Sequence, residues 1–407
     1  MGESARAEQV SQRTANLAGL LRALRQGPRS RSQLATHSGL YKATVTSLLT
    51  ELADRGLVRT AGLRAGGPGR PSRLVELREE AGYGLALRIE ADGFAAMTVD
   101  LAGTPLARSA RSADVAALGL DHAMDELAAL AVSVCAGLSG PPIGVTVSVP
   151  GLVDASSQLV RYAPVLRWRD AGIADLLAAR LGVDHAGITV DNEANLGAFA
   201  EATYGAGVGA RAVFYLSGGV SVGGGLVSGG DLLRGASGFA GEIGHIPVDP
   251  RGENCPCGRT GCLETKAGFP ALLRAATVPS DVLNDPKLGV DAKMTVLRDR
   301  LRGGDQRAAA AVHDLGVALG IPLATVVALF DPEIVVLGGY FAGLAQWLAE
   351  PIRVALGDGT NGSGIRCRVT ASPLGTAAPL LGAAHLSTER LFADPTIAPL
   401  TVTRVSV

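Results

Sequence analysis

A cluster of one histidine and three cysteines near the middle of the chain places the strongest single constraint on how it can fold. His245 is followed ten residues later by Cys255, and Cys257 and Cys262 come within the next seven residues. Soft thiolates with one imidazole form the closed, four-coordinate ligand set that holds structural zinc. The glycines and Pro256 around them let a short loop fold back on one ion. The sequence therefore predicts one structural Zn²⁺ per chain.

Two carboxylates stand beside this cluster. Glu242 lies three residues before His245, and Glu264 lies two residues after Cys262. Neither is needed for the metal, and both can accept hydrogen bonds from sugar hydroxyls. On one helical turn, Glu242 and His245 would project to the same side. Ordinary surface charge is the alternative, but acids on both sides of a metal cluster favour ligand contact.

Composition limits the class of protein. A chain of 407 residues predicts two or three domains. Few cysteines, three of them clustered, and no recognisable signal peptide predict a cytoplasmic protein without disulfides. No run of eighteen apolar residues occurs, so we expect no membrane span. Aromatic residues are scarce, which argues against a stacking platform for single-stranded nucleic acid.

The charge is unevenly distributed. Residues 1–80 carry thirteen Lys and Arg against seven Asp and Glu, whereas the remainder carries twenty-four against thirty-one. A basic head on an acidic body is typical of a nucleic-acid-binding domain joined to a soluble sensor. A solvated basic surface without function is the alternative interpretation.

Residues 1–80 predict a winged helix-turn-helix domain. Four leucines at helical spacing form a first helix, which ends at Gly27-Pro28. Ser30 and Gln33 form a capping box that starts a short second helix. Gly39 makes the turn to a third helix that begins near Lys42. A strand, a Gly- and Arg-rich loop and a second strand then form the wing.

We expect the third helix to enter the major groove of an operator duplex with Lys42, Thr44 and Ser47. Tyr41 stands at the N-cap position and cannot cap, so the start of this helix is poorly specified. At the wing tip, Arg70 between glycine and proline can reach into a narrow, A·T-rich minor groove. The alternative for the tip is a plain Gly/Pro-rich linker.

From about Gly84 the pattern changes to alternating strands and helices, which predicts an α/β body with sheets covered on both faces. Six apolar runs read as strands, and two Ala- and Leu-rich stretches, Met124–Leu138 and Ala308–Phe330, read as helices. The strands are expected at Leu85–Ile89, Ala95–Val99, Ile143–Val149, Ile188–Val190, Ala212–Leu216 and Ile334–Leu337. His385 and the other histidines outside the cluster are expected to be surface or packing residues.

The zinc spacing, together with several weaker motifs in a fixed order, resembles the signature of the ROK family of repressors and sugar kinases. These motifs are Val149-Pro150-Gly151-Leu152-Val153-Asp154, Asp191-Asn192-Glu193-Ala194-Asn195, the glycine-rich stretch 217–225, Asp331-Pro332-Glu333 and Gly338-Gly339. The resemblance implies two actin-like (ribonuclease H-like) lobes with a cleft between them. It implies a first lobe over 81–192, completed by 376–407, and a second lobe with the zinc site over 193–375. It also implies sugar contacts from Gly151, Asn192, Glu193, Glu242, His245 and Glu264.

Both loops that bind ATP phosphates in such kinases are altered here. Arg88 stands where the family has a magnesium-site aspartate, and Glu90 replaces a glycine, so phosphate is blocked and repelled. In the second loop, Val220 stands where a hydroxyl would meet a phosphate. Removal of one hydrogen bond that stabilises the transition state can raise the activation barrier of phosphoryl transfer by ~2.7–4 kcal/mol. Glu193 occupies the position of the catalytic aspartate, and its longer side chain would displace the base.

The sequence therefore predicts a non-enzymatic regulator, most simply a repressor. Its partners would be an operator duplex and a sugar or sugar phosphate effector. Half-site geometry implies a homodimer or homotetramer. Two alternatives stay open: an active ROK sugar kinase, and a regulator that answers to a protein partner. Val165, where relatives often carry asparagine, would change the accepted hydroxyl pattern.

Overall fold

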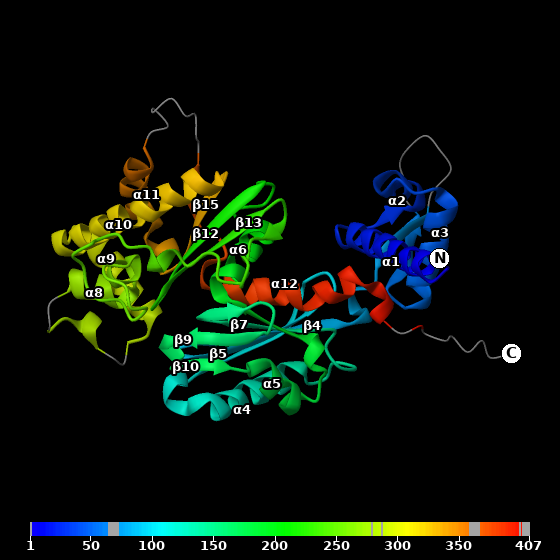
Figure 1. The fold of residues 1–407 in the computed structure, drawn as a ribbon, viewed down its shortest axis with the longest axis horizontal. Helices are drawn as coiled ribbons and strands as arrows, with labels where there is room; N and C mark the ends of the chain where they lie inside the picture. The colour runs from blue at the N-terminus through cyan, green and yellow to red at the C-terminus, as the bar shows by residue number, and fades with distance from the viewer. Residues whose placement is uncertain are drawn as a thin grey trace.

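The computed structural model describes residues 2–63, 73–277, 280–285, 288–357, 367–398 and 400 (Figure 1). The predicted wing-tip contact, Arg70, lies outside these residues. The predicted winged helix-turn-helix is present at the N-terminus, and an α/β body follows it. The head consists of α1 (Gly2–Arg25), β1 (Arg29–Ser30), α2 (Arg31–Ser38), α3 (Lys42–Asp54), β2 (Val58–Leu63) and β3 (Arg73–Leu77).

The head folds around the leucines of its three helices, which are fully buried together with residues of the small β1-β3-β2 sheet. The capping box at α2 is confirmed. Gln33 N donates to the Ser30 hydroxyl at 3.2 Å, and Ser30 N donates to the Gln33 side chain at 2.8 Å. Tyr41 precedes α3 without a side-chain cap, as expected, and is 87% exposed. The sequence pattern alone thus specifies most of this domain.

The body contains two five-stranded sheets. The first is built from β4 (Tyr83–Glu90), β5 (Gly93–Asp100), β6 (Pro105–Ser112), β7 (Val145–Val149) and β11 (Ile188–Asn192). The second is built from β12 (Ala212–Gly218), β13 (Val222–Ser228), β14 (Asp231–Leu232), β15 (Ile334–Gly339) and β16 (Arg368–Ala371). A small antiparallel sheet of β8 (Leu152–Asp154), β9 (Leu159–Ala163) and β10 (Trp168–Ala171) extends the first.

The two large sheets share one strand order. The first runs β11-β7-β4-β5-β6, and the second runs β16-β15-β12-β13-β14. In each, three consecutive antiparallel strands are extended by two parallel strands on the side of the first strand. The β4–β5 hairpin and the β12–β13 hairpin therefore occupy equivalent positions in the two halves of the body.

Helices cover both faces of each sheet. The outer face of the first sheet packs on α4 (Val115–Cys135) and α5 (Ile173–Leu181). Between the two sheets lie α6 (Glu193–Tyr204) and α12 (Ala378–Ala393), the latter extending toward the head (Figure 1). The remaining helices cover the other face of the second sheet: α7 (Leu263–Ala267), α8 (Phe269–Ala276), α9 (Val290–Arg302), α10 (Gln306–Phe330) and α11 (Tyr340–Leu356).

The chain crosses between the sheets where β11 ends and α6 begins, at Asn192–Glu193. It returns through a 3₁₀ turn, η6 (Gly375–Ala377), which leads into α12. We propose to divide the body at these crossings, into 81–192 with 376–407 as one lobe and 193–375 as the other. The head, over 1–80, then contacts the first lobe twice: the chain continues from it into β4, and the end of α12 packs against it.

One predicted helix, Met124–Leu138, differs from the structure at both ends: α4 begins nine residues earlier, at Val115, and ends at Cys135. Gly119, with φ +73°, interrupts α4, so the sequence pattern shows only the regular part that follows.

The other predicted helix, α10, is long and apolar enough to cross a membrane, with a mean hydropathy of 1.8. It is nevertheless a core helix, because more than half of that segment is buried against α8 and α11.

Candidate metal cluster and ligand cleft

The histidine and three cysteines that the sequence singled out come together in space. Their potential ligand atoms all lie within 4.8 Å of one another. Cys255 Sγ lies 3.6 Å from His245 Nδ1, and Cys257 Sγ lies 3.6 Å from Cys262 Sγ. Two zinc–sulfur bonds of about 2.3 Å at a tetrahedral angle separate the sulfurs by about 3.8 Å, so the spacing fits one tetrahedral ion.

The loop geometry explains this convergence. Gly261 has φ +69°, and a Cβ at this position would lie 1.6 Å from the Asp249 carbonyl oxygen. Glycine therefore lets the loop close before Cys262, which is fully buried. Burial raises the pKa of the Cys262 thiol to about 12. A divalent cation would supply the charge that keeps such buried thiols as thiolates.

Glu242 lies beside the cluster, on the side of the His245 ring away from Cys255. Glu242 Oε2 is 3.8 Å from His245 Nε2, and Val222 N donates to Glu264 Oε2 at 3.2 Å. Burial, and then the neighbouring charge of Glu264, raise the pKa of Glu242 to about 7. The two acids are therefore near one another, and both are partly buried.

The second predicted group, Gly151 with Asn192, is joined by a hydrogen bond. Asn192 Nδ2 donates to the Gly151 carbonyl oxygen at 2.8 Å, and Asn192 Oδ1 accepts from Ala194 N at 2.7 Å, capping α6. Gly151 has φ +139°, and a Cβ there would lie 2.5 Å from the Tyr162 carbonyl oxygen. Much of the hydrogen-bonding capacity of Asn192 is thus used by the fold, which leaves one amide N–H for a ligand.

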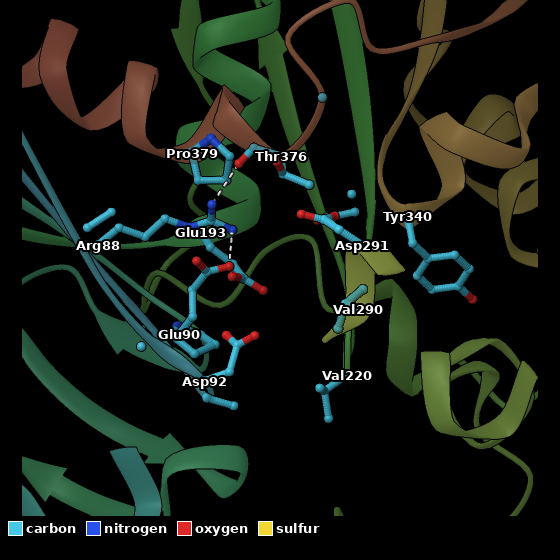
Figure 2. A pocket seen from close by; sticks show the side chains of 18 of the residues that line it. Arg88, Glu90, Asp92, Glu193, Val220, Val290, Asp291, Tyr340, Thr376 and Pro379 are labelled. Carbon is cyan, nitrogen blue, oxygen red and sulfur yellow. Dashed lines mark hydrogen bonds and ion pairs between the residues drawn. The ribbon is translucent and has the colours of Figure 1, made fainter. Parts of the chain in front are cut away.

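A cavity of about 840 Å³ lies between the two sheets (Figure 2). Glu193, the first residue of α6, lines it together with Arg88, Glu90 and Asp92. A smaller cavity of about 340 Å³ contains Glu264, and Val165, Val220 and Ser221 line both cavities. Of the predicted sugar contacts, Gly151, Asn192, Glu242 and His245 line neither cavity.

Figure 2 shows Arg88 extending between Thr376 and the acids at the cavity floor. Its Nη1 donates to the Thr376 carbonyl oxygen at 2.6 Å, and its Nη2 lies 2.7 Å from Glu90 Oε1. Burial raises the pKa of Glu193, an effect that Arg88 opposes. Burial also raises the pKa of Glu90, and the neighbouring Glu193 and Asp92 charges add to it. Arg88, which the family resemblance aligns with a magnesium-site aspartate, is therefore held between a main-chain carbonyl oxygen and acidic side chains.

The second phosphate position is the turn between β12 and β13. Gly219 N donates to the Ser221 carbonyl oxygen at 2.8 Å, which closes a tight turn with Val220 at its tip. The Val220 side chain is 46% exposed and borders both cavities. An apolar side chain at this tip offers no hydroxyl to a phosphate.

On the head, Lys42, Thr44 and Ser47 are all exposed on α3, whereas Val45 and Leu48 face the core. Thr46 also lies on the exposed face, but its hydroxyl donates back to the Lys42 carbonyl oxygen at 2.9 Å. All three predicted DNA contacts are therefore accessible to solvent; Thr44 and Ser47 are neighbours on the helix surface, and Lys42 lies in its first turn.

Sequence reasoning missed one ion pair close to the site. Arg234 Nη2 lies 2.7 Å from Oδ2 of the buried Asp191, so the loop after β14 is tied to the end of β11. Asp191 Oδ1 also accepts from Asn195 Nδ2 at 3.0 Å. The motif that contains Asp191 was recognised, but nothing near Arg234 in the sequence signals its partner 43 residues earlier.

Comparison with known proteins agrees with this architecture. Residues 85–390 match the ROK family, and residues 14–62 match the IclR helix-turn-helix domain. The xylose repressor of Bacillus spizizenii is 27% identical over 372 residues, covering 91% of this chain and 93% of the repressor.

Two solved structures are similar as well. A ROK family transcriptional regulator, a homologue of the E. coli MLC protein, has a TM-score of 0.76 at 24% identity and covers 94% of this chain and 97% of its own. This likeness shows that the fold extends through the head. A ROK family glucokinase from Streptomyces griseus, in complex with glucose and AMPPNP, has a TM-score of 0.64 at 31% identity, covering 76% of this chain and 100% of its own. With a family match that spans most of its length, the chain belongs to the ROK family.

Proposed function

We propose that the chain is a sugar-responsive, DNA-binding transcriptional regulator, and specifically a repressor of carbohydrate-metabolism genes. One observation carries the proposal. A winged helix with exposed polar residues on its third helix is joined to a ROK body in which Arg88 is held between Thr376 and Glu90, at the position where we expect the kinases to carry a magnesium-site aspartate. The B. spizizenii relative named as a xylose repressor spans nearly the whole chain, head included, and so supports the same function.

Sugar binding would use Glu193 and Glu264, which line the two cavities, together with neighbouring polar groups that line neither. We propose that Glu242, Glu264 and Glu193 accept hydrogen bonds from sugar hydroxyls and that Asn192 donates its remaining amide N–H. His245, held by zinc through Nδ1, would present Nε2 to Glu242 or to the ligand. One structural Zn²⁺ on His245, Cys255, Cys257 and Cys262 would hold this loop rigid, which lowers the entropic cost of binding.

The alternative is an active sugar kinase, which the likeness to the glucokinase supports. Two features of the cleft argue against it. Arg88 would repel a magnesium ion where the reaction needs one, and the longer side chain of Glu193 would displace the general base from the position that an aspartate would give it. We therefore propose that the body senses a ligand without transforming it.

The head would dock α3 in the major groove through Lys42, Thr44 and Ser47, with Arg70 at the wing tip reaching the minor groove. Two heads on a palindromic operator would require a homodimer or homotetramer in the cytoplasm.

A two-part experiment on the full chain tests the function. Genomic fragments retained by the protein are sequenced to find an operator, and binding of D-xylose and D-glucose is measured as a thermal shift. We expect an enriched palindromic site and a shift with at least one sugar. Lys42→Ala should bind that site more weakly, whereas Lys293→Ala, on α9 of the body, should bind it as the wild type does. Absence of any enriched site would show that the head has another role.

A further inference from the structure

The end of α12 is packed into the head. Leu391 and Phe392 of α12 are fully buried in one apolar cluster with the leucines of α1, α2 and α3. Arg25, the last residue of α1, lies with its Cζ 4.3 Å above the Phe392 ring. The head and the body therefore share one continuous hydrophobic core at this junction.

A chain of polar side chains crosses the same junction. Arg25 Nη1 lies 2.5 Å from Glu389 Oε1, and the same carboxylate oxygen lies 3.0 Å from His385 Nε2. On the other side of its ring, His385 Nδ1 is hydrogen-bonded to the Tyr204 hydroxyl. Arg25 and His385 keep only 12% of their side-chain surface exposed. The chain links α1 of the head, α12 and α6.

The chemistry of these four side chains determines which group donates and which accepts each hydrogen bond. The Tyr204 hydroxyl donates to Nδ1 of a neutral His385, whose Nε2–H donates to Glu389, and Arg25 donates to Glu389 from the head. Burial lowers the pKa of His385, in keeping with the neutral ring that this arrangement needs. Each group thus fixes the orientation of the next.

The two helices that carry these residues also begin at the large cavity. Glu193, the first residue of α6, lines the cavity, and Tyr204 is the last residue of the same helix. Thr376 lines the cavity just before α12, as do Pro379 and Leu380 in its first turn, and His385 and Glu389 follow further along. Thus α12 runs from the cavity to the head, and α6 runs from the cavity to His385 in the middle of α12.

We propose that the Tyr204–His385–Glu389–Arg25 chain is the contact that couples occupancy of the cavity to the position of the DNA-binding head. A ligand between the lobes shifts α6 relative to α12, and the shift makes or breaks the Tyr204–His385 contact at the far ends of these helices. The Arg25–Glu389 ion pair then forms or breaks, which changes the position of α1 relative to α12. Tyr204, His385 and Glu389 act as positioning residues and touch neither ligand nor DNA. This inference rests on the proposed function.

The test uses the full chain, the operator recovered by genomic selection, and D-xylose and D-glucose as probes. For each variant, sugar Kd and operator Kd with and without sugar are measured. In the wild type we expect sugar to change operator affinity by about 5–150-fold, the usual range of allosteric coupling. Tyr204→Phe removes only the hydroxyl, and Glu389→Gln removes the charge that binds both neighbours. Both variants should keep the wild-type sugar Kd while the sugar-induced change in operator Kd falls toward one.

A matched control is Arg180→Ala, which removes a partly exposed ion pair with Asp125 inside the first lobe. It should leave the coupling unchanged. Full wild-type coupling in both Tyr204→Phe and Glu389→Gln would overturn the inference while leaving the proposed function intact. If the wild type binds neither sugar, or binds one without any change in operator affinity, the proposed function is wrong and the inference falls with it.

Discussion

Arg88 donates to the main-chain carbonyl oxygen of Thr376 at 2.6 Å, so a side chain of β4 is tied to the turn that starts α12. The same guanidinium neutralises Glu90 and faces Glu193. Arg88 is therefore a structural link between the first sheet and the C-terminal helix, at the edge of the cavity that it and Thr376 both line.

We expect no ATP-dependent phosphorylation of D-glucose or D-xylose, because a fixed cation occupies the magnesium position and Val220 offers no hydroxyl to phosphate. ADP release in the presence of Mg²⁺ measures it. Turnover above background that disappears in Glu193→Ala would establish the chain as a kinase.

Lys42→Ala should weaken operator binding at every sequence and reduce the slope of log K against log salt by about one, since one phosphate contact is lost. Arg70→Ala should weaken binding mainly at A·T-rich flanks. Fluorescence anisotropy over a salt series measures both. An unchanged slope for Lys42→Ala would remove this residue from the interface.

Metal analysis of protein purified without chelator should give one zinc per chain. Cys257→Ser should reduce the zinc content well below one and lower the unfolding temperature of the body, because one thiolate of a tetrahedral site is lost. Cys367→Ser is the control, since this cysteine lies outside the cluster. Zinc-free wild-type protein would falsify the metal assignment.

Glu242→Gln should weaken sugar binding and leave operator binding intact. Gln keeps one acceptor oxygen but replaces the other with an amide group that donates, so a sugar hydroxyl that donates to that position loses its partner, at a cost of ~1–3 kcal/mol, or about 5–150-fold in Kd. Isothermal titration with the responsive sugar measures the change. Glu350→Gln, an exposed residue of α11, should bind sugar as the wild type does. A normal sugar response in Glu242→Gln would place the site elsewhere in the cleft.

The junction should lose stability in mild acid. Burial lowers the pKa of His385 below its usual 6.5. The unfolded chain therefore takes up this proton first, and the stabilising contribution of neutral His385 is present above pH 6.5 and is lost as the pH falls below it. Arg25, Glu389 and Tyr204 face the ring from the three packed helices.

The pKa of Glu389 itself is lowered by His385 and Arg25 against the effect of burial, so its titration lies at more acidic pH. Thermal unfolding on either side of pH 6.5 should show a steeper loss for the wild type than for His385→Gln. Equal pH dependence of the two proteins would show that His385 does not titrate at the junction.

Much of the fold could be predicted from local patterns. The head follows from leucine spacing, a capping box and turn glycines, and six body strands follow from their apolar runs. The missed strands had no such signal. In β6 most side chains are exposed, and β13 contains Gly223, Gly224 and Gly225, so neither forms an apolar run. Gly225 packs directly on α6, where a Cβ would lie 2.6 Å from the Ala194 carbonyl oxygen.

In the candidate site, too, local sequence patterns predicted some features, and only the tertiary fold revealed others. The metal cluster was predictable because its ligands lie within eighteen residues of sequence and their chemistry is distinctive. His385 was expected to have only a surface or packing role, yet it lies in a partly buried series of hydrogen-bonded polar side chains. Its partners Tyr204 and Arg25 are 181 and 360 residues away, so only the tertiary fold reveals them. Arg88 could be read as a lost catalytic residue, but its bond to Thr376 depends on a contact across 288 residues.

The shared strand order of the two sheets has a consequence for how enzymes and sensors of this architecture are related. The altered phosphate positions, Glu90 at the end of β4 and Val220 after β12, lie at symmetry-equivalent hairpins of the two halves. Glu90 is only partly buried and Val220 is substantially exposed, so neither belongs to an apolar core. Exchange between phosphoryl transfer and sensing would therefore need changes at these two turns, at the adjacent Arg88 and at Glu193, all of which line the cavity, while both folded cores stay intact.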